Sequence, residues 1–453
     1  MTVMQGIAGY IVRTRYGDIP FLVIERAKGC IMDSIGVALY GSTFEASQIA
    51  LAVVGGASSP GGGASILCGG AKVIPCLASF INGVMAHVTD FDDVLFMLRG
   101  HPSCVLMPVA IAACESAGGN GKDFLTSFVV GSEIAGKMGR VMAWQHYELG
   151  WHSTGTIGAL GAAATASKAL NLDRDKTANA LGIAASSAAG LRVNFGTMTK
   201  SYHVGHAAMV GVLAAQLAEK GFDASSVVLE DNMGFARLFG CDSEISSVAA
   251  DLGIDYALSE IILKPYPSCV GTHSAVEAIL KIREEINAKL EDIAQIEVRV
   301  RPAPTSSLFY HNPQTTLQGK FSMEFCISAA LVFGKLGISE FERECVFNPH
   351  VRGLMGKIII IPDIEMGKIS MERRVLSPVQ LKMKTVEGEE FCETILEARG
   401  SPSNPMSQDE IREKFRECAR YVLPDSGVET ALETIERLET LKNISELTSN
   451  LIS

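Results

Sequence analysis

The sequence predicts a mostly α-helical protein with a smaller α+β domain, and three observations favour this fold class. Small and apolar residues recur at helical spacing from residue 5 to about residue 262, with few alternating strand patterns. The pattern changes at Lys264-Pro265-Tyr266-Pro267, where two prolines interrupt any helix. Two charged amphipathic helices close the chain. We therefore expect one all-helical domain from residues 1–262 and 403–453, with an α+β domain over 263–402.

In the first part of the chain, the apolar runs Cys104–Cys114 and Thr156–Ala166 predict buried helices. Both runs are shorter than the roughly 20 residues that span a bilayer. Glycines and alanines between Gly155 and Ala164 would let helices approach closely. The glycine-rich stretch Gly55–Gly63 predicts a surface loop. A phosphate-binding loop is the alternative, but the stretch lacks both the P-loop ending and the dinucleotide fingerprint.

The second part of the chain alternates between helical and strand patterns. Helical periodicity extends from His273 to Leu290, and apolar and charged residues then alternate over Ile296–Val300 as in a strand with one wet face. Further elements are expected as a strand at Ile358–Ile361, a hairpin formed by Val379–Lys384 and Phe391–Thr394, and helices at Ser407–Tyr421 and Val428–Leu441.

Composition excludes several classes of protein. With 453 residues, of which 47% are hydrophobic and 20% charged, the chain can bury a large core and an oligomer interface. With a net charge of -11, the chain lacks the basic surface that binding to nucleic acids requires. The 11 cysteines are odd in number and contain no C-x-x-C pair, so neither a disulfide framework nor a thiolate metal site is indicated. The N-terminus lacks a signal-peptide pattern, and we expect a cytoplasmic protein with no membrane segment.

The densest polar cluster is Asp90-Phe91-Asp92-Asp93, followed closely by His101. Three carboxylates within four residues repel one another unless a positive or protonated group lies among them. The first interpretation is that these aspartates are solvated or cap a helix. The alternatives are an acid or base facing a cavity, and a site for a hard cation, which prefers oxygen ligands.

Two other segments combine histidine with small or basic residues. His152 follows Trp151 at the head of an apolar helix, where a structural histidine is the first interpretation and a functional one the alternative. Lys200 precedes His203 and His206, which are three residues apart and can share one helical face. A zinc pair would lack a third ligand at suitable spacing, so we favour structural or catalytic use without metal.

Lys264 lies at the predicted domain junction, and His273 begins the helix that follows. A solvated lysine is the first interpretation of Lys264, and a lysine held rigidly for a carboxylate partner is the alternative. No serine lies in a G-x-S-x-G turn, and no cysteine has an activating signature, so a covalent hydrolase is poorly supported.

A set of segments, weak singly but specific in its order and spacing, resembles the MmgE/PrpD family over nearly the whole chain. The segments are Asn82-Gly83, His87, Asp90-Phe91-Asp92-Asp93, His101-Pro102-Ser103, Gly150-Trp151-His152, Gly190 to Lys200, Lys264-Pro265-Tyr266-Pro267 and Thr272-His273. This family includes 2-methylcitrate dehydratases, cis-aconitate decarboxylases and iminodisuccinate epimerases, which act at a carbon beside a carboxylate.

The resemblance implies a homodimer whose active site lies in the interdomain cleft and contains neither a metal nor another cofactor. The catalytic residues implied for this chain are Asp90, His101, His152, Lys200 and Lys264. Lys200 and Lys264 would also bind substrate, together with His273 and Arg192. In this scheme the lysines hold carboxylates and stabilise enolate-like charge, while the two histidines transfer protons in an order that the sequence leaves open.

Two departures from the family pattern concern the substrate. Val94 stands where dehydratase-like and decarboxylase-like members commonly have threonine, and Phe325 stands where they tend to have tyrosine. A lost hydroxyl whose buried partner stays unpaired costs about 1 to 3 kcal/mol. Tyr202, Tyr266 or Tyr310 is the candidate replacement, and a substrate less polar than methylcitrate or cis-aconitate is the alternative explanation.

The function expected from these observations is a cofactor-independent lyase that acts on a small di- or tricarboxylate, with dehydration of a 2-methylcitrate-like acid as the first expectation. Epimerisation of an iminodisuccinate-like acid and decarboxylation of a cis-aconitate-like acid are the alternatives, because both involve the same kind of carbon. A non-catalytic member that binds a carboxylate metabolite is the alternative from another class. It accounts less well for the joint presence of Asp90, both histidines and both lysines.

Overall fold

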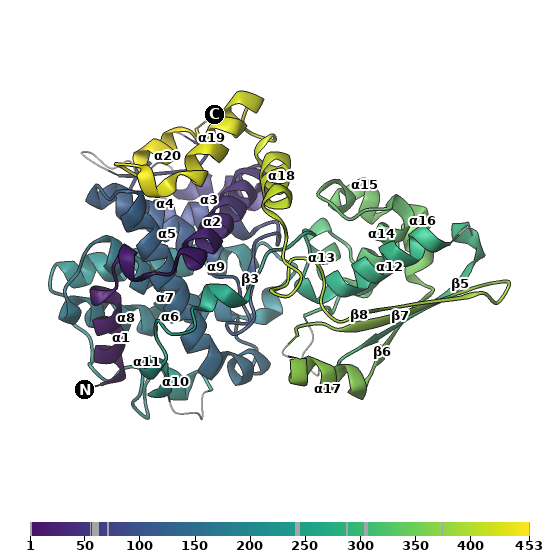
Figure 1. Cartoon of the computed structure of the whole chain (residues 1–453), viewed down its shortest axis with the longest axis horizontal. Helices are drawn as coiled ribbons and strands as arrows, with labels where there is room; N and C mark the ends of the chain where they lie inside the picture. Colours follow the sequence, from purple (N-terminus) through teal and green to yellow (C-terminus); the bar gives the residue numbers. More distant parts are fainter. Residues whose placement is uncertain are drawn as a thin grey trace.

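The computed structural model consists of a helical domain and an α+β domain (Figure 1), and the two largest hydrophobic clusters of the described residues form their cores. The structure describes residues 2–54, 56, 63–69, 72–240, 245–286, 289–302, 307–373 and 375–452. Nearly all of the glycine-rich stretch Gly55–Gly63, predicted as a surface loop, lies outside the described residues. The first core draws on both ends of the chain and the second on its middle, so the predicted fold class is confirmed.

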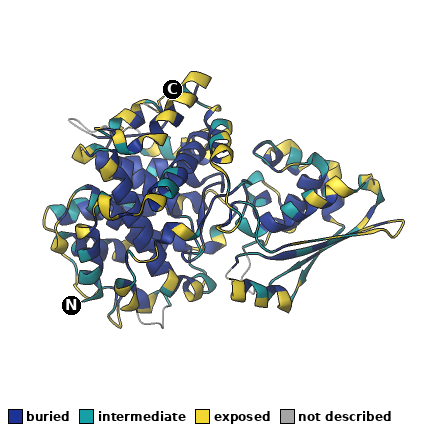
Figure 2. Cartoon of the chain, in the orientation of Figure 1, coloured by how far each residue is buried: buried dark blue, intermediate teal, exposed yellow. Residues whose placement is uncertain are grey.

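The helical domain is built around long buried helices (Figure 2). Its helices from the first part of the chain are α1 (Val3–Arg13), α2 (Phe21–Gly41), α3 (Glu45–Val54), α4 (Pro75–His87), α5 (Ser103–Ala117), α6 (Gly121–Glu148), α7 (Ser153–Ala169), α8 (Arg174–Ser187), α9 (Thr199–Glu219), α10 (Phe235–Leu238) and α11 (Ser247–Ala250). Two short antiparallel pairs join β1 (Ala64–Ser65) to β2 (Lys72–Val73) and β3 (Val94–Leu95) to β4 (Ile261–Ile262).

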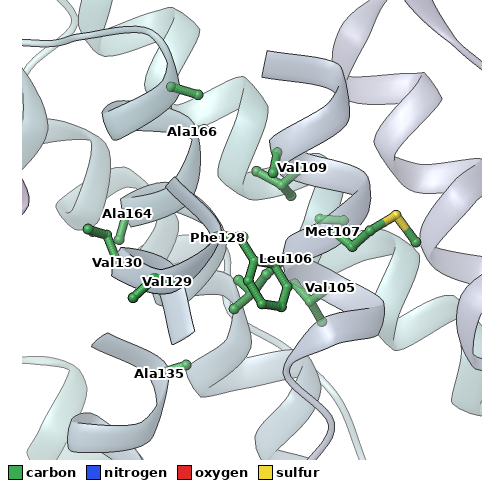
Figure 3. Packing of buried hydrophobic residues seen from close by; sticks show 14 of the residues in the cluster. Val105, Leu106, Met107, Val109, Phe128, Val129, Val130, Ala135, Ala164 and Ala166 are labelled. Carbon is green, nitrogen blue, oxygen red and sulfur yellow. The ribbon is translucent and has the colours of Figure 1, made fainter. Parts of the chain in front are cut away.

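The apolar runs of the sequence form the centre of this core, as predicted. Figure 3 shows Leu106 of α5 beside Phe128 of α6, and both side chains are fully buried. Small residues bring α7 against α6, since a Cβ added to Gly161 would lie 2.9 Å from the Cβ of Ala135. Among the described residues, no single helix is both long and apolar enough to cross a membrane. Only the pair α2 and α3, which is bent by 85°, has the length and composition of a membrane span.

The C-terminal helices return to the helical domain. They are α18 (Gln408–Ala419), α19 (Asp425–Glu436) and α20 (Ser445–Ser449). Phe415 of α18 lies on α2, where a Cβ at Gly36 would come within 3.1 Å of its ring. Lys414 forms a buried ion pair with Asp33 of α2 at 2.6 Å. The last part of the chain therefore packs into the first hydrophobic core.

The α+β domain contains a four-stranded sheet with the strand order β6-β5-β7-β8. Its strands are β5 (Ile293–Val300), β6 (Ile358–Pro362), β7 (Val379–Thr385) and β8 (Glu390–Ile395). The helices of this domain are α12 (His273–Glu285), α13 (Thr316–Gly319), α14 (Met323–Phe333), α15 (Arg343–Val346), α16 (Pro349–Met355) and α17 (Ile364–Arg373). Strand β5 pairs in parallel with β6 and antiparallel with β7, and β7 and β8 form the predicted hairpin.

Figure 1 shows α12 and α14 on one side of this sheet and α17 on the other. The expected helix beginning at His273 ends at Glu285 and not at Leu290, because Ile286 adopts an extended backbone as the chain turns towards β5. The alternating pattern of the β5 segment is confirmed, with Ile296 and Val298 buried in the second core.

Candidate active site

A short strand pair brings two distant parts of the sequence to the same place. In the β3–β4 pair, Val94 faces Ile262 and Leu95 faces Ile261. The aspartate cluster directly precedes β3, and Lys264 follows β4 by two residues. Pairing of these strands therefore places Asp90 beside Lys264, 174 residues further along the chain, and Lys264 donates a 2.8 Å hydrogen bond to the Asp90 carbonyl oxygen.

Close packing of α4 against α9 positions a second pair of groups. Gly83 and Gly205 face each other so tightly that a Cβ at Gly83 would lie 3.1 Å from the Gly205 Cα. His87 is the last residue of α4, and Lys200 lies in the first turn of α9. The glycine contact therefore allows the Lys200 ammonium to donate to His87 Nε2 at 2.6 Å.

Asp90 is the point where these elements meet. Its Oδ1 accepts a hydrogen bond from Lys200 Nζ at 2.9 Å and lies 3.2 Å from Lys264 Nζ. His101 Nε2 lies 3.8 Å from the same oxygen. Asp90 has a left-handed backbone with φ of 52°, a conformation that non-glycine residues rarely adopt and that is often found at functional sites. One carboxylate is thus held between two ammonium groups.

Asp92 connects two histidines behind this cluster. His87 Nδ1 lies 2.8 Å from Asp92 Oδ2, and His101 Nδ1 lies 3.2 Å from the same oxygen. His101 Nδ1 is also 2.8 Å from the Asp93 carbonyl oxygen, which can only accept a hydrogen bond. The proton of neutral His101 therefore belongs on Nδ1, and its Nε2 lone pair is left towards Asp90.

His152 provides the third imidazole. It precedes α7, and its Nδ1 lies 3.1 Å from His203 Nδ1. Gly190 makes this contact possible, because a Cβ there would lie 3.3 Å from the His152 Cβ and 3.4 Å from the His203 ring. Among the described residues, His152 Nε2 has no hydrogen-bond partner. His152 is therefore only half satisfied within the protein, which favours the functional interpretation over the structural one.

A cavity of about 550 Å³ connects these groups, within the range typical of small-molecule sites. Residues from both domains form its wall, including Asp90, Val94, Arg99, His101, Tyr147, His152, Phe195, Lys200, Lys264, Cys269, Arg301, Ser307, His311, Phe321 and Pro378. All five residues predicted as catalytic therefore contribute to one interdomain cavity.

The electrostatics of the cavity favour an anionic ligand. Burial alone would raise the pKa of Asp90, but Lys200 and Lys264 hold that pKa well below its usual range. Burial alone would lower the pKa of Lys264, but Asp90 and Asp92 hold it above its usual value. Two ammonium groups and one carboxylate therefore face the cavity here, while the balancing carboxylate of Asp92 lies behind the wall.

Asp93 explains how three neighbouring carboxyl groups are tolerated. Burial raises its pKa to about 8, although hydrogen bonds from Ser103 oppose the shift. The Ser103 backbone N–H donates to Asp93 Oδ1 at 3.2 Å, and the Ser103 hydroxyl contacts Oδ2. Asp93 is therefore mainly protonated at neutral pH, so the cluster carries two negative charges and not three.

The histidines of the site are neutral at neutral pH. Burial lowers the pKa of His87 to about 3, and the Asp92 carboxylate only partly offsets this shift. Burial and the nearby lysines also lower the pKa of His101, and burial and Lys200 lower that of His152. A neutral imidazole has one nitrogen that accepts a proton and one that carries it, so each ring can act as an acid or a base.

The first interpretation of Lys264 as a solvated group is wrong, and the aspartates are not solvated either, although Asp93 does accept the backbone N–H of the first residue of α5, as a helix cap would. Lys264, Asp92 and Asp93 are each 0% exposed, and Asp90 is 3% exposed. The lysine lies inside the junction because its carboxylate partner comes from the other side of the β3–β4 pair.

Two residues expected to bind substrate lie away from the cavity wall. Arg192 packs over the Tyr147 ring with its guanidinium carbon 3.7 Å from the ring centre and donates to the Tyr147 carbonyl oxygen at 2.6 Å. His273 is buried beneath Tyr266, and its Nε2 lies 3.2 Å from the Ser268 carbonyl oxygen. The binding role of these two residues stays a prediction that the cavity geometry does not favour.

Tyr147 is the functional candidate that the sequence did not reveal. Its ring lines the cavity, and its hydroxyl lies 2.6 Å from Ser307 Oγ across the domain boundary. None of the three tyrosines considered as replacements at Phe325 belongs to the cavity wall, and Phe325 itself is fully buried in the second core. Tyr147 lies near the end of a 28-residue helix with no local motif, so no sequence signal identified it.

The same cluster contains the groups that a metal ion would use. Ligand atoms of His87, Asp90, Asp92 and His101 all lie within 4.8 Å of one another. However, His87 Nε2 and Asp90 Oδ1 already accept hydrogen bonds from Lys200, and two fixed ammonium groups would repel a cation. The residues present therefore fit an anion better than a metal ion.

Comparison with known proteins agrees with this geometry. The model of the MmgE/PrpD N-terminal domain matches residues 5–247, and that of the MmgE/PrpD C-terminal domain matches residues 266–440. Human cis-aconitate decarboxylase is 29% identical over 99% of this chain and 94% of its own length. Cis-aconitate decarboxylase of Aspergillus terreus is 27% identical over 95% of this chain and 92% of its own length.

A second group of relatives has a different activity. The probable 2-methylcitrate dehydratase of Saccharomyces cerevisiae is 24% identical over 80% of this chain and 74% of its own length. The 2-methylcitrate dehydratase of Salmonella typhimurium is 23% identical over 82% of this chain and 80% of its own length. Since the two domain models together span most of its length, this chain belongs to the MmgE/PrpD family.

Proposed function

We propose that the protein is a lyase that acts at the carbon beside a carboxylate of a small di- or tricarboxylate. The observation that carries this proposal is the arrangement of Asp90 between Lys200 and Lys264 on the wall of a cavity that also contains His101 and His152. Such a cavity provides fixed positive charge and two neutral imidazoles, which are the groups that this chemistry needs.

The lysines bind the reacting end of the substrate. Cleavage of a bond beside a carboxylate develops enolate-like negative charge, and preorganised donors in a cavity stabilise that charge. Lys200 and Lys264 are already fixed by Asp90, so little reorganisation is needed when charge develops. Asp90 acts mainly by orienting the two ammonium groups.

The histidines transfer the proton. His101 Nε2 has its lone pair available, because Nδ1 donates to the Asp93 carbonyl oxygen. His152 Nε2 is the second candidate, and its protonation depends on which nitrogen of the His152–His203 contact carries hydrogen. We assign His101 as the first choice of base because its tautomer is fixed by a neighbouring acceptor.

Decarboxylation and dehydration differ in the bond that breaks. In decarboxylation, the C–C bond to one carboxylate breaks, CO₂ leaves, and the electron pair left on carbon takes up a proton from a histidine that has first accepted that proton from water. In dehydration, a histidine removes the proton from carbon, the pair forms a C=C bond, and hydroxide leaves as water with a proton from the second acid. Both steps need the same lysines.

Of these two, we favour decarboxylation of a cis-aconitate-like tricarboxylate over dehydration, which was the first expectation from sequence. Relatives named cis-aconitate decarboxylase share 27% to 29% identity over at least 95% of this chain. Relatives named 2-methylcitrate dehydratase share 23% to 24% over about four fifths of it. Dehydration of a 2-methylcitrate-like acid stays the second candidate. Epimerisation and a non-catalytic binding role have no specific support.

A substrate panel tests this proposal. The purified protein is incubated with cis-aconitate, 2-methylcitrate and related polycarboxylates, and ¹H NMR follows substrate loss while evolved CO₂ is measured separately. Decarboxylation predicts loss of cis-aconitate with an equal amount of CO₂. Dehydration predicts a new vinylic or methyl signal without CO₂. Consumption of no member of the panel by correctly folded protein would reject a lyase function of this class.

A further inference from the structure

A second group of cations lies on the wall of the same cavity, separate from the lysines. Arg99 follows β3 in the helical domain, and Arg301 follows β5 in the α+β domain. Both guanidinium groups lie over the Trp144 ring, with their central carbons 4.2 Å and 5.8 Å from its centre. The two domains therefore each contribute one arginine to a common position.

Aromatic and hydroxyl groups surround the place where the two arginines meet. Arg99 also lies over the Tyr147 ring at 4.4 Å, and Arg192 supports the same ring from a distance of 3.7 Å. The Tyr147 hydroxyl and Arg192 Nη2 both contact Ser307 Oγ, at 2.6 Å and 3.3 Å. Stacking and hydrogen bonds across the domain boundary therefore hold the side chains in place before any ligand binds.

The charges of the two arginines are incompletely compensated. Burial lowers the pKa of both Arg99 and Arg301, and Arg301 lowers the pKa of Arg99 further. Glu148 lies 3.3 Å from Arg99 Nη1, and its side chain is 34% exposed. Within the described part of the chain, Arg301 forms no ion pair with a carboxylate. Two desolvated guanidinium groups that share one half-exposed carboxylate form an unfavourable arrangement unless an anion joins them.

Backbone strain supports a functional role for this position. Arg99 is one of the few described non-glycine residues with a positive φ, at 50°. The other strained residue of the segment is Asp90, at 52°. A left-handed conformation costs free energy, and such residues cluster at active sites and ligand clamps. One strained residue therefore stands at each of the two cation groups of the cavity.

We propose that Arg99 and Arg301 together bind a carboxylate of the substrate that is remote from the reacting carbon. This inference rests on the proposed lyase function and adds the residues that bind the second carboxylate of the substrate. The lysines take the reacting end of the molecule and the arginines take the far carboxylate, so a polycarboxylate binds and a short monocarboxylate does not. A guanidinium fork suits a carboxylate because it donates two parallel hydrogen bonds. Since the arginines come from different domains, the same contact holds the cleft closed.

Calorimetric titration with two unreactive probes tests the inference without any turnover. Tricarballylate has three carboxylates, and 2-ethylsuccinate has the same skeleton with one terminal carboxylate replaced by methyl. Wild-type protein should bind tricarballylate roughly ten- to a hundredfold more tightly than 2-ethylsuccinate, the range expected for one charge-assisted contact. Arg99→Met and Arg301→Met should each remove most of this preference and leave the weaker binding of 2-ethylsuccinate nearly unchanged.

Matched variants separate this effect from a general loss of charge or fold. Arg343→Met removes an exposed arginine of the α+β domain and should retain the full preference. Arg99→Lys and Arg301→Lys keep the charge without the fork and should retain part of it. Circular dichroism checks folding of each variant.

The outcomes also separate this inference from the proposed function. If both arginine-to-methionine variants keep the wild-type preference for tricarballylate, or if wild-type protein has no preference, the arginine inference is overturned. The turnover panel then decides independently whether the protein is a lyase. Loss of preference in the arginine variants would support the inference even if no member of the panel were consumed.

Discussion

Two buried aspartate–lysine groups in the described part of the chain have similar distances between their charged atoms but differ in their surroundings. Lys414 pairs with Asp33 at 2.6 Å and donates to the carbonyl oxygens of Phe91 and Lys264 at 2.7 Å and 2.8 Å. Asp90 is held by Lys200 and Lys264 at similar distances. The first group lies inside the helical core, whereas the second lines the interdomain cavity.

This difference shows that burial and ion pairing do not by themselves identify a catalytic group. Lys414 uses its donors on Asp33 and two carbonyl groups, so it joins α18 to α2 and to the domain junction. Lys200 and Lys264 share one carboxylate and face a space of about 550 Å³. Only the second group has positive charge to offer to a ligand, and the following predictions test that distinction.

The largest effect on stability is expected for Lys414→Met. Removing one partner of a buried pair leaves Asp33 uncompensated, which costs about 3 to 5 kcal/mol. Urea unfolding should show this loss as a lower midpoint. At a temperature where the variant is folded, kcat should remain close to that of the wild type. A stable Lys414→Met with strongly reduced kcat would place Lys414 in the site and remove the distinction between the two groups.

Lys200→Met and Lys264→Met should give the largest effect on catalysis. Each removes a charge-assisted contact worth about 1.5 to 3 kcal/mol, so kcat/KM should fall roughly ten- to more than a hundredfold. Steady-state kinetics on the substrate found by the panel measures this effect. Lys442→Met, which changes an exposed lysine near the C-terminus, should have almost no effect. Near-normal turnover by both site variants would mean that the site has been placed wrongly.

Much of the fold could be predicted because its signals are local. The alternation in Ile296–Val300 and the hairpin pattern after Val379 each lie within one element, and both agree with the structure. The helix that begins at His273 ends earlier than its sequence pattern predicts. Its apolar period continues beyond Glu285, but the connection to β5 requires the chain to leave the helix there.

The site could be predicted only where its chemically active side chains lie in short sequence motifs. Asp90, His101 and Lys200 lie in such motifs, and the structure brings them together as expected. The burial of Lys264 could not be read from its neighbours, because its partner lies 174 residues away. Tyr147 and Arg301 carry no local signal at all, since their proximity depends on how the two domains dock.

We expect an effect of intermediate size from pH on the free energy of unfolding. Buried histidines inside and outside the site should both contribute to it. Burial lowers the pKa of His146, outside the cavity wall, to about 4, as it lowers that of His87 to about 3. In unfolded protein the pKa of histidine is about 6.5, so below this pH the unfolded state binds protons that the folded state does not. Stability should therefore fall as pH drops from about 6.5 towards 4.

Replacing His146 measures its share of this slope. Each such histidine contributes up to about 1.4 kcal/mol per pH unit. His146→Gln should make the dependence of unfolding free energy on pH shallower between 4 and 6.5, as measured by urea titrations at several pH values. An unchanged slope would show that His146 titrates in the folded protein as it does in water.

The smallest effect is expected from removal of metal ions. Because Lys200 and Lys264 already occupy Asp90, exhaustive treatment with a chelator should leave kcat/KM unchanged. Activity assays before and after chelation, with metal analysis of the protein, check this expectation. Loss of activity that one divalent metal restores would show that His87, Asp90, Asp92 and His101 act as ligands and that the lysines move aside.

The central claim is that the cavity around Asp90 performs proton transfer at a carbon beside a carboxylate. The most direct measurement is turnover in D₂O, with NMR following deuterium at that carbon in the wild type, Lys200→Met and Lys414→Met. We predict incorporation by the wild type and by folded Lys414→Met, and at least roughly tenfold slower incorporation by Lys200→Met. Equal rates in all three proteins, or decarboxylation that leaves no solvent deuterium in the product, would contradict the claim.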